Sequence, residues 1–538
     1  MCPLSQEIFM LDTDEILNSA RRGFSGVFIP ACLTLMLSAC GDGSGEDSTT
    51  TYDPTGSAGS ADDSAGEADA GMSAGDGGAC VGPPALAGDG DGDGDGDGDG
   101  DGDGDGDGDT SIRVMHLGVG VPGVDVYANQ GAAPAFTNLL YRESTAITAL
   151  PADDYTFDVA LNPSTSVMDS ILTVGPLSLT ADVDYTAVAV GQLANNDVEV
   201  IALVDDRAGI DPANVRLQVT HAASTVGEVD IYEVSDPANP AALLSDVPYK
   251  ASDTLNVPVA DYLIGIDADN DPSTIEFTYD VGLAALGLPG GTFLNVYANE
   301  STDGVDLVVQ QDDGSVLVIP PTTTTSIRVM HLGNGVPAVD VYANAALMDP
   351  PAFTNVAFRE STTQTTLDAG ENTFDLAPNP SFNVNQSILT VDSLPMSAAI
   401  DYTAVAVGTS TTDVSVLAIV DNRRNIPDTQ YRVQVTHAAS TVGEVDIYEV
   451  SDPTTPALLL ENVPYTATGS LDLDVGDYVI GIDADNDTSA MEFTYNASLA
   501  TLMVPGGAFV NVYANENGAS VDLVVQLDDG TTVPVPPN

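Results

Sequence analysis

From Ser111 onward, apolar and polar residues alternate in short runs that are separated by turn-forming residues. This alternation is typical of strands that bury one face, because successive side chains point to opposite sides of a strand. No segment shows the period of an amphipathic helix. The first unit predicts seven strands, at 112–117, 124–128, 139–144, 154–160, 170–174, 184–190 and 198–204.

The pattern returns along the chain with two periods. The segment THAASTVGEVDIYEVSDP stands unchanged at 220–237 and 436–453, and DYTAVAVG at 184–191 and 401–408. A weaker similarity recurs at half that distance, roughly every 107 residues. We infer a duplicated unit and a later duplication of the pair. The sequence therefore predicts an all-β fold of tandem immunoglobulin-like or transthyretin-like antiparallel β-sandwich domains behind a disordered acidic N-terminal tether.

The N-terminus carries a targeting pattern. Arg21 and Arg22 precede the apolar run GFSGVFIPACLTLMLSAC, which has the length of a signal-peptide core and is too short to span a membrane comfortably. The run ends in LSAC, which resembles the lipobox of bacterial lipoproteins. That resemblance implies lipidation of Cys40, and Gly41 after it implies sorting to the outer membrane. We therefore expect an exported protein, lipid-anchored to the cell envelope at the outer membrane or cell surface.

The next segment is rich in Gly, Asp, Ser and Ala and closes in an Asp-Gly alternation, so it has almost nothing to bury. No cysteine lies beyond residue 80, and the repeats must hold together without disulfides. The expected organisation is a lipoprotein signal peptide at 1–39, a disordered tether at 40–110, and four sandwich repeats at 111–212, 213–323, 324–428 and 429–538.

The charge balance is strongly acidic. The chain has 12 Lys+Arg against 81 Asp+Glu, a formal net charge of −69. Such a chain repels phosphate backbones, which excludes nucleic acid as a partner. The acidity has two readings that remain open: a well-solvated surface and an attraction for divalent cations.

The chain has four histidines, and each stands at the same place in its repeat: His116, His221, His331 and His437. Strand parity puts His221 on the same face as Val219, which faces the core. An unpartnered buried polar group costs about 1–3 kcal/mol, so we expect a neutral, hydrogen-bonded structural residue. An aspartate follows each histidine by nine residues: Asp125, Asp230, Asp340 and Asp446. Either it holds the histidine across a hairpin or it caps amides of the loop between them.

A catalytic site is not predicted. Ser224 and Ser440 follow their histidines by three residues, but the first and third repeats have Val119 and Asn334 there. Neither serine lies in a Gly-x-Ser-x-Gly elbow, and the histidines are too far apart in sequence for a zinc pair. We therefore assign no catalytic residue and expect no enzyme.

Calcium is the one candidate cofactor. The segments GIDADNDPSTIEF (265–277) and GIDADNDTSAMEF (481–493) place carboxylates at alternate positions, with Glu276 or Glu492 downstream. Oxygen ligands at positions 1, 3 and 5 are typical of loops that wrap calcium, although the usual glycine at position 6 is absent. Asp and Asn are also common in plain hairpin turns, so both readings stay open. The candidate ligands are Asp267, Asp269, Asp271, Asp483, Asp485 and Asp487.

Several motifs together resemble a known family. The pattern RVMHLGxGVPxVDVYAN, the turn LPADDYTF, the strand DYTAVAVG and the end VDDR are similar to the domain of unknown function DUF4397. The resemblance covers nearly all of 111–538 and is strongest in the first and third repeats. The second and fourth depart from it, with AASTVGE in place of the glycine-proline loop. The resemblance implies a secreted or surface bacterial protein with tandem copies, and the family has no assigned activity.

The sequence thus favours a non-enzymatic, lipid-anchored surface protein whose sandwich modules serve adhesion or envelope structure. The alternative is an envelope protein that binds a carbohydrate or small ligand, with calcium. A hydrolase ranks third. The expected partners are the membrane, through the anchor, and a surface glycan or protein.

Overall fold

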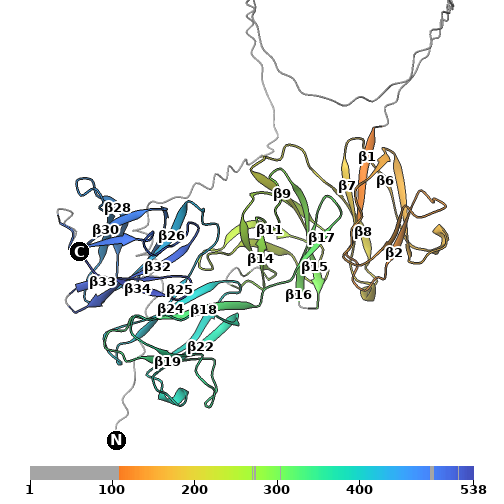
Figure 1. Cartoon of the computed structure of the whole chain (residues 1–538). Helices are drawn as coiled ribbons and strands as arrows, with labels where there is room; N and C mark the ends of the chain where they lie inside the picture. The colour runs from red at the N-terminus through yellow and green to blue at the C-terminus, as the bar shows by residue number, and fades with distance from the viewer. Residues whose placement is uncertain (1–107, 270, 272–273, 303, 485–489, 519) are drawn as a thin grey trace, which may run out of the picture. The chain divides into compact units, whose positions relative to one another are not determined.

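The computed structural model describes residues 108–538, apart from 270, 272–273, 303, 485–489 and 519. This part of the chain is built almost entirely from β-strands, and eight small sheets pair into sandwich-like units (Figure 1). The all-β prediction is confirmed. The predicted signal peptide, the lipidation site Cys40 and nearly all of the tether lie outside the described residues. Within the described residues, no helix has the length and apolar character needed to cross a bilayer.

The first repeat contains eight strands and two short 3-10 helices. Its elements are β1 Asp109–His116, β2 Val124–Ala128, β3 Phe136–Leu139, β4 Thr148–Pro151, β5 Asp154–Leu161, η1 Val167–Asp169, β6 Ser170–Ser178, β7 Asp184–Val190, η2 Leu193–Asn195 and β8 Glu199–Val204. One sheet has the order β4-β1-β7-β8 and the facing sheet β3-β2-β5-β6.

The second repeat contains nine strands. They are β9 Asn214–His221, β10 Val229–Glu233, β11 Ala241–Val247, β12 Ser252–Pro258, β13 Asp261–Asp267, β14 Phe277–Gly282, β15 Phe293–Ser301, β16 Gly304–Gln310 and β17 Val316–Ile319. The sheet orders are β12-β9-β15-β16-β17 and β11-β10-β13-β14.

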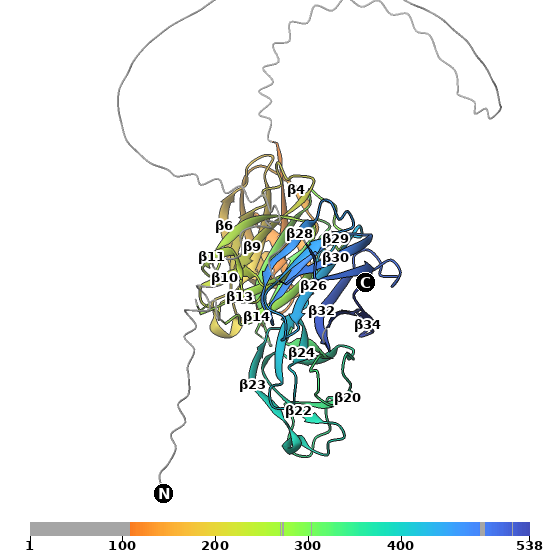
Figure 2. The same ribbon diagram turned by 90° about the vertical axis from the view of Figure 1, so that its left-hand side faces the viewer.

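The third and fourth repeats have the same sheet orders as the first and second. Figure 2 shows several of their strands, among them β22 and β24 of the third repeat and β26 and β32 of the fourth. The third consists of β18 Thr324–His331, β19 Val339–Ala343, β20 Phe353–Val356, β21 Thr365–Asp368, β22 Gly370–Pro378, η3 Val384–Gln386, β23 Leu389–Met396, β24 Asp401–Val407 and β25 Ser415–Val420. The fourth consists of β26 Gln430–Ala438, β27 Val445–Glu449, β28 Ala457–Val463, β29 Thr468–Asp474, β30 Asp477–Asp483, β31 Phe493–Ser498, β32 Phe509–Asn517, β33 Ser520–Gln526 and β34 Thr532–Val535.

The first strand of every repeat has one antiparallel and one parallel neighbour. β1 is antiparallel to β4 and parallel to β7, with His116 opposite Ala189. The pairs β9–β15, β18–β24 and β26–β32 repeat the parallel arrangement, and the remaining strand pairs are antiparallel. The predicted antiparallel sandwich thus contains one parallel strand pair in each repeat. Residue alternation sets which face of a strand is buried but not which strands become neighbours.

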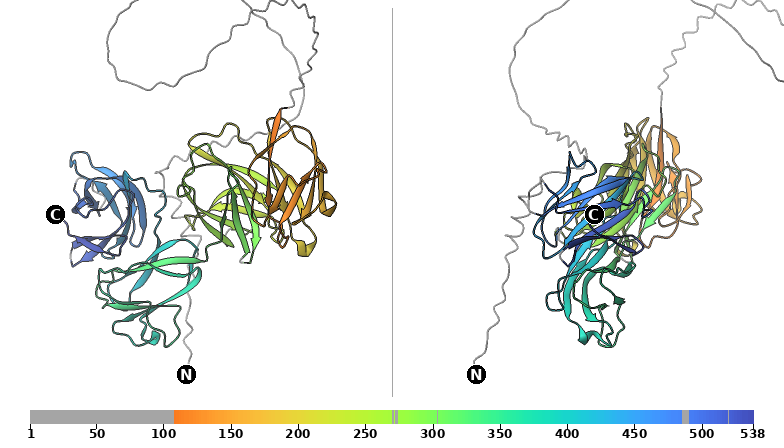
Figure 3. Two further views of the ribbon diagram at one scale, coloured as in Figure 1. Left: turned by 45° about the vertical axis from the view of Figure 1, so that its right-hand side comes forward. Right: turned by 60° about the vertical axis from the view of Figure 1, so that its left-hand side comes forward.

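The cores lie between the two sheets of each repeat, which Figure 3 shows as facing layers of strands. In β1, Ile112 and Val114 point into this core. The opposite face of the strand is buried as well, because Met115 packs with Tyr297 of the second repeat. An equivalent cluster joins the third and fourth repeats. The first strand is therefore buried on both faces because two different cores meet on it.

The predicted strand at 139–144 is wrong. β3 ends at Leu139, Arg142 has a positive φ of 62°, and a further strand, β4, follows at Thr148–Pro151. A positive φ takes a non-glycine residue out of the extended region and turns the chain. Arg142 is held there by contacts with the second repeat, which residue alternation within the first repeat could not reveal.

Candidate functional site

In each repeat, the histidine at the end of the first strand bridges the two ends of the loop that follows that strand. In the second repeat, Nδ1 of His221 accepts a hydrogen bond from the Ala223 amide at 3.4 Å, and Nε2 donates to the Gly227 carbonyl at 2.6 Å. Burial lowers the pKa of His221, although the bond to Gly227 acts in the opposite direction. The ring is therefore neutral with its proton on Nε2. The other three histidines make the same pair of contacts: His116, His331 and His437.

The aspartate of the first repeat is surrounded by donors. Asp125 is 3% exposed and accepts hydrogen bonds from the Asn138 amide (2.9 Å), Asn162 Nδ2 (2.9 Å), and the Ser164 amide (2.9 Å) and hydroxyl (2.6 Å). Burial raises its pKa, but the hydrogen bonds from Ser164, Asn162 and Asn138 outweigh burial and lower the pKa to about 2. In the third repeat, the donors to Asp340 are Asn355, Asn379 and Ser381. We call this arrangement the aspartate cradle.

Two arrangements of His and Asp were open from the sequence. The structure gives the two side chains separate partners in every repeat: the histidine bonds its own loop, and the aspartate bonds amides elsewhere. No hydrogen bond joins them in any of these described pairs. The donors to the aspartate therefore lie outside the loop between the histidine and the aspartate.

The aspartates of the second and fourth repeats have much poorer surroundings. Asp230 accepts a hydrogen bond from the Asp246 amide at 2.6 Å, and its other oxygen lies 3.5 Å from the Tyr232 hydroxyl. It stands opposite Asp267 in the β10–β13 pairing, whereas Asp125 stands opposite Ala160. The fourth repeat repeats this pattern, with Asp446 bonded to the Asn462 amide and opposite Asp483. Two acidic residues therefore face each other where the first repeat has one.

The acidic loop of the second repeat (Asp267–Glu276) brings three of the acidic residues together. One oxygen each from Asp267, Asp269 and Glu276 lies within 4.8 Å of the others. The remaining contacts are local: the Asp269 amide donates to Asp267 Oδ1, and the Ala268 amide donates to Glu276 Oε2. Asp271 is not in this group, and its amide donates to Asp269 Oδ1.

The matching loop of the fourth repeat is only partly described. Asp483 is 1% exposed, and the Ala484 amide donates to Glu492 Oε2 at 2.7 Å, as in the second repeat. The predicted ligands Asp485 and Asp487 lie outside the described residues.

The two serines near the histidines have other partners. Ser224 donates to Glu300 Oε1 at 2.7 Å, and Ser440 donates to Glu516 Oε1 at 2.6 Å. Because both nitrogens of His221 are occupied by backbone groups, this histidine does not face the serine hydroxyl as a base.

A buried arginine at the joint between paired repeats escaped the sequence reasoning. The Arg113 side chain is fully buried and donates to Asp205 (2.9 Å) and Thr186 (2.9 Å) of its own repeat. It also donates to the Gln311 carbonyl of the second repeat (2.9 Å). Asn295 of the second repeat donates to Asp205 at 3.1 Å. The other pair of repeats has the same contacts among Arg328, Thr403, Asp421, Asn511 and Leu527.

A second arginine reaches across the same joint. Arg142 pairs with Asp306 at 2.7 Å and donates to the Glu300 carbonyl at 3.0 Å, and Arg359 does the same with Asp522 and Glu516. We call Arg113 and Arg142, with their counterparts Arg328 and Arg359, the arginine clamp. The sequence signal was an arginine on an otherwise apolar strand in a chain with very few cations.

Every cation of the described residues takes part in an ion pair. The residues are Arg113, Arg142, Arg207, Arg216, Lys250, Arg328, Arg359, Arg423, Arg424 and Arg432. Arg207 and Arg423 add contacts to the same joints, with Asp312 and Asp528. The scarce positive charge of the chain is therefore concentrated where two repeats meet.

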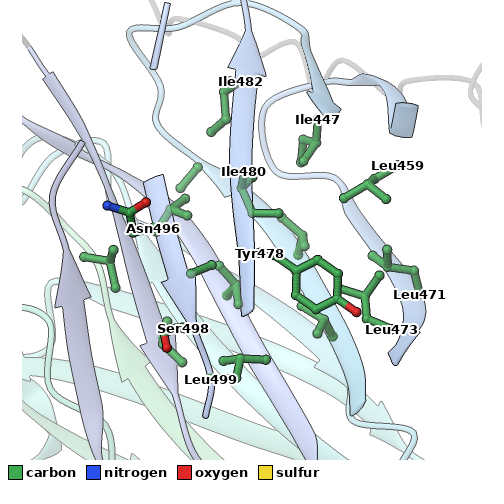
Figure 4. Close-up of a pocket in the computed structure, with 18 of the residues that line it drawn as sticks. Ile447, Leu459, Leu471, Leu473, Tyr478, Ile480, Ile482, Asn496, Ser498 and Leu499 are labelled. Carbon is green, nitrogen blue, oxygen red and sulfur yellow. The ribbon is translucent and has the colours of Figure 1, made fainter. Parts of the chain in front are cut away.

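The fourth repeat encloses an apolar pocket of about 210 Å³ between its sheets (Figure 4). Leu471, Leu473 and Ile480 line it, with Asn496 and Ser498 among the few polar side chains. Three lining side chains are smaller than their counterparts in the second repeat: Val433 stands where that repeat has Leu217, Ala497 where it has Val281, and Val535 where it has Ile319. Such a lining has few of the polar groups that bind sugar hydroxyls and fits a small apolar molecule better.

Comparison with solved structures and with curated proteins adds little. One solved structure with some similarity is the Bacillus anthracis TIE protein, at 12% sequence identity and a TM-score of 0.12, covering 76% of this chain and 68% of that one. So low a TM-score supports no conclusion about fold or function. No curated protein matches.

Comparison with protein families finds two segments. Residues 110–232 and 325–448 match the family described as "Domain of unknown function (DUF4397)". Each match covers one odd-numbered repeat and ends inside the second strand of the repeat that follows. The first match therefore includes Arg113 and Arg142 but not their partners Gln311 and Asp306 in the second repeat. The chain contains two DUF4397 domains, one in each pair of repeats.

Proposed function

We propose that the chain is a non-enzymatic, lipid-anchored protein of the bacterial cell surface whose paired sandwiches act as rigid modules in adhesion or envelope structure. The observation that carries this proposal is the arginine clamp. It is made in both pairs from the same residues: Arg142 and Arg359 form ion pairs across the joint, and the buried Arg113 and Arg328 donate across it to a backbone carbonyl. These contacts add to the apolar clusters in which the paired sandwiches meet.

The clamp favours a rigid joint for a physical reason. Arg113 and Asp205 form a fully buried ion pair within the first repeat, and each also has a hydrogen-bond partner in the second repeat. A buried polar or charged group that loses such a partner costs about 1–3 kcal/mol. Bending at this joint would separate the ion pair from Asn295 and from the Gln311 carbonyl. A pair of repeats therefore transmits force as one body, which suits a stalk or an adhesive module.

The surroundings of the histidines support a non-enzymatic role. Both ring nitrogens of His221 are engaged by the backbone, and the hydroxyl of Ser224 bonds Glu300. A hydrolytic site needs a base that faces its nucleophile. These described residues lack that arrangement.

The functional test compares cells that carry the full chain with a deletion strain. We expect adhesion under shear, or resistance of the envelope to detergent, to fall in the deletion strain. Arg142→Ala combined with Arg359→Ala should weaken both joints and reproduce part of that loss at equal surface abundance. Arg424→Ala is the matched control, since its ion pair with Asp280 does not join the two repeats of one pair. Unchanged adhesion and envelope resistance on deletion would overturn the proposal.

The anchor is tested separately. Labelled palmitate should be incorporated into the full chain and not into Cys40→Ser. External protease should remove the repeats from intact cells if they face outward. A chain that takes up no label, or one found in the cytoplasm, would remove the anchor from the proposal.

A second candidate function is the binding of a small apolar ligand, and the pocket of the fourth repeat favours it. Ala497→Val with Val433→Leu restores two of the larger side chains of the second repeat and should fill the pocket. Binding of an apolar fluorescent dye to the full chain should then fall at least about tenfold. Equal dye binding by the filled variant would exclude this site.

A further inference from the structure

We propose that Asp267, Asp269 and Glu276 bind a calcium ion at the end of β13 in the second repeat. This metal site does not depend on the adhesive role proposed above. It rests on three observations: a buried oxygen that lacks a partner, two acidic residues in register, and the geometry of three carboxylates.

The first observation concerns one atom. Asp267 is 1% exposed, and its Oδ1 accepts the Asp269 amide at 3.0 Å. Its Oδ2 is buried and has no hydrogen-bond partner among the described residues. A charged oxygen removed from water without a partner is costly, and native proteins rarely leave one. An oxygen left in this way is a ready ligand for a cation.

The second observation is the repulsion across β10 and β13. Asp230 and Asp267 are directly opposite each other, a position in which like charges destabilise a sheet. In the first repeat the corresponding pair is Asp125 and Ala160, and the donors Asn162 and Ser164 satisfy the single carboxylate. The second repeat has an added acidic residue, and Asp269 and Asp271 stand where the first repeat has the donors Asn162 and Ser164. A bound cation would supply the missing positive charge.

The third observation identifies the ion. The three oxygens lie within 4.8 Å of one another, and oxygens that share one calcium at about 2.3–2.6 Å can be separated by up to about 5 Å. Carboxylates are hard ligands that suit calcium, and the group contains no His or Cys of the kind that zinc prefers. Asp269 and Glu276 are exposed, so an ion can enter from solvent and keep water ligands.

The described residues of the fourth repeat show the same acidic pair and the same loop contact as the second repeat. Asp446 and Asp483 stand in register, and Glu492 accepts the Ala484 amide as Glu276 accepts that of Ala268. The segment GIDADND is identical in the two repeats. We therefore expect an equivalent site there, and the experiment must separate the two.

The experiment titrates the chelator-treated full chain with calcium chloride and follows hydrogen exchange in peptides that cover β10 and β13. We expect a dissociation constant of about 10⁻⁴–10⁻³ M, typical of extracellular modules, and slower exchange in these peptides. Asp267→Asn and Glu276→Gln should each weaken the calcium effect on these peptides at least about tenfold, while the fourth repeat still responds. Asp253→Asn, an exposed carboxylate on β12, is the charge-matched control.

The calcium proposal and a purely structural role for Asp267 predict opposite results in chelator. If Asp267 is a calcium ligand, Asp267→Asn should exchange more slowly than the wild type without calcium, because the repulsion with Asp230 is removed. With calcium, the wild type should exchange more slowly than Asp267→Asn. The proposal is overturned if Asp267→Asn keeps the wild-type calcium response, as weak condensation on the acidic tract would give. It is also overturned if Asp267→Asn exchanges faster than the wild type in chelator.

Terbium provides an independent location test, since tyrosine close to a bound lanthanide sensitises its emission. Tyr232 lies beside Asp230, with its hydroxyl 3.5 Å from Oδ2. Tyr232→Phe should remove part of the terbium emission and leave the calcium affinity unchanged. Emission that is equal in Tyr232→Phe and the wild type would place the ion elsewhere.

Discussion

Asp125 in the first repeat and Asp230 in the second occupy the same place, nine residues after a buried histidine, but their surroundings differ. Four hydrogen bonds satisfy Asp125, three of them from the Asn162-Pro163-Ser164 loop after β5. After β13, the corresponding loop has acidic residues in place of those donors, and Asp230 faces Asp267. One copy of the duplicated unit satisfies its aspartate internally, and the other accumulates negative charge.

The difference shows how a duplicated sandwich acquires a new property without a change of fold. The strand order and the histidine contacts are alike in the two repeats, although the second has one further strand, β17. Around the aspartate, the residue opposite it and the loop after that residue have changed. Because a loop at the end of a sheet is free to change where a core strand is not, chemistry diverges there first.

The largest expected effect is at the aspartate cradle. Asp125→Ala leaves the Asn138 and Ser164 amides without their acceptor and should lower the free energy of unfolding of the first repeat by about 2–4 kcal/mol. Native-state hydrogen exchange on β2 and β5 peptides measures this repeat by itself. Asp340→Ala should do the same in the third repeat. A loss below about 1 kcal/mol would show that the cradle contributes little.

Acid should weaken the cradle. The folded pKa of Asp125, about 2, lies below the unfolded value of about 3.9, so its contribution is present above pH 4 and is lost as the pH falls toward 2. Exchange in β2 and β5 should accelerate through that interval. In Asp125→Asn, the acceleration should be smaller. An identical pH profile in this variant would contradict the assignment.

At the histidines, we expect no difference between the repeats in the free energy lost on mutation. His221→Ala removes an acceptor from the Ala223 amide and a donor from the Gly227 carbonyl, and should cost more than about 1 kcal/mol. His116→Ala should cost about the same, because its contacts are equivalent. Exchange in β9 and β1 peptides reports the two losses. A marked inequality would mean that the repeats use this residue differently.

The smallest effect is expected at Asp230. In chelator, Asp230→Ala should change the free energy of unfolding of the second repeat by no more than about 0.5 kcal/mol, because one lost bond to the Asp246 amide is offset by relief of repulsion with Asp267. Exchange in β10 peptides gives the value. A loss as large as that of Asp125→Ala would make the two aspartates equivalent after all.

The sequence predicted the fold class and the inward side of the first strand well. His221 shares the core face with Val219, and β2, β5 and β7 lie close to the predicted ranges. These predictions succeeded because burial of one face follows directly from alternation. The strand at 139–144 failed because Arg142 is held by the next repeat, and such a contact leaves no local periodicity.

The candidate sites divide in a similar way. The spacing of acidic residues predicted Asp267 and Asp269 as ligands, with Glu276 downstream. In the structure, carboxylate oxygens of these three residues lie close together. Asp271 is outside this group, and its amide donates to Asp269. Spacing could not show that Asp230 stands opposite Asp267, because strand register depends on how β10 and β13 pair. The arginine clamp was missed entirely, since its partners lie far apart in the chain.

For this protein, the repetition, the sandwich class and the buried position of the histidines follow from the order of residues, since they depend on local alternation and on repeated segments. The parallel strand pair, the partners of each aspartate and the joint between repeats depend on which distant segments meet. Folding settles these through packing and hydrogen bonding across hundreds of residues. That is why Arg113, an exception on an apolar strand in the sequence, proves in the folded chain to be the buried centre of a joint.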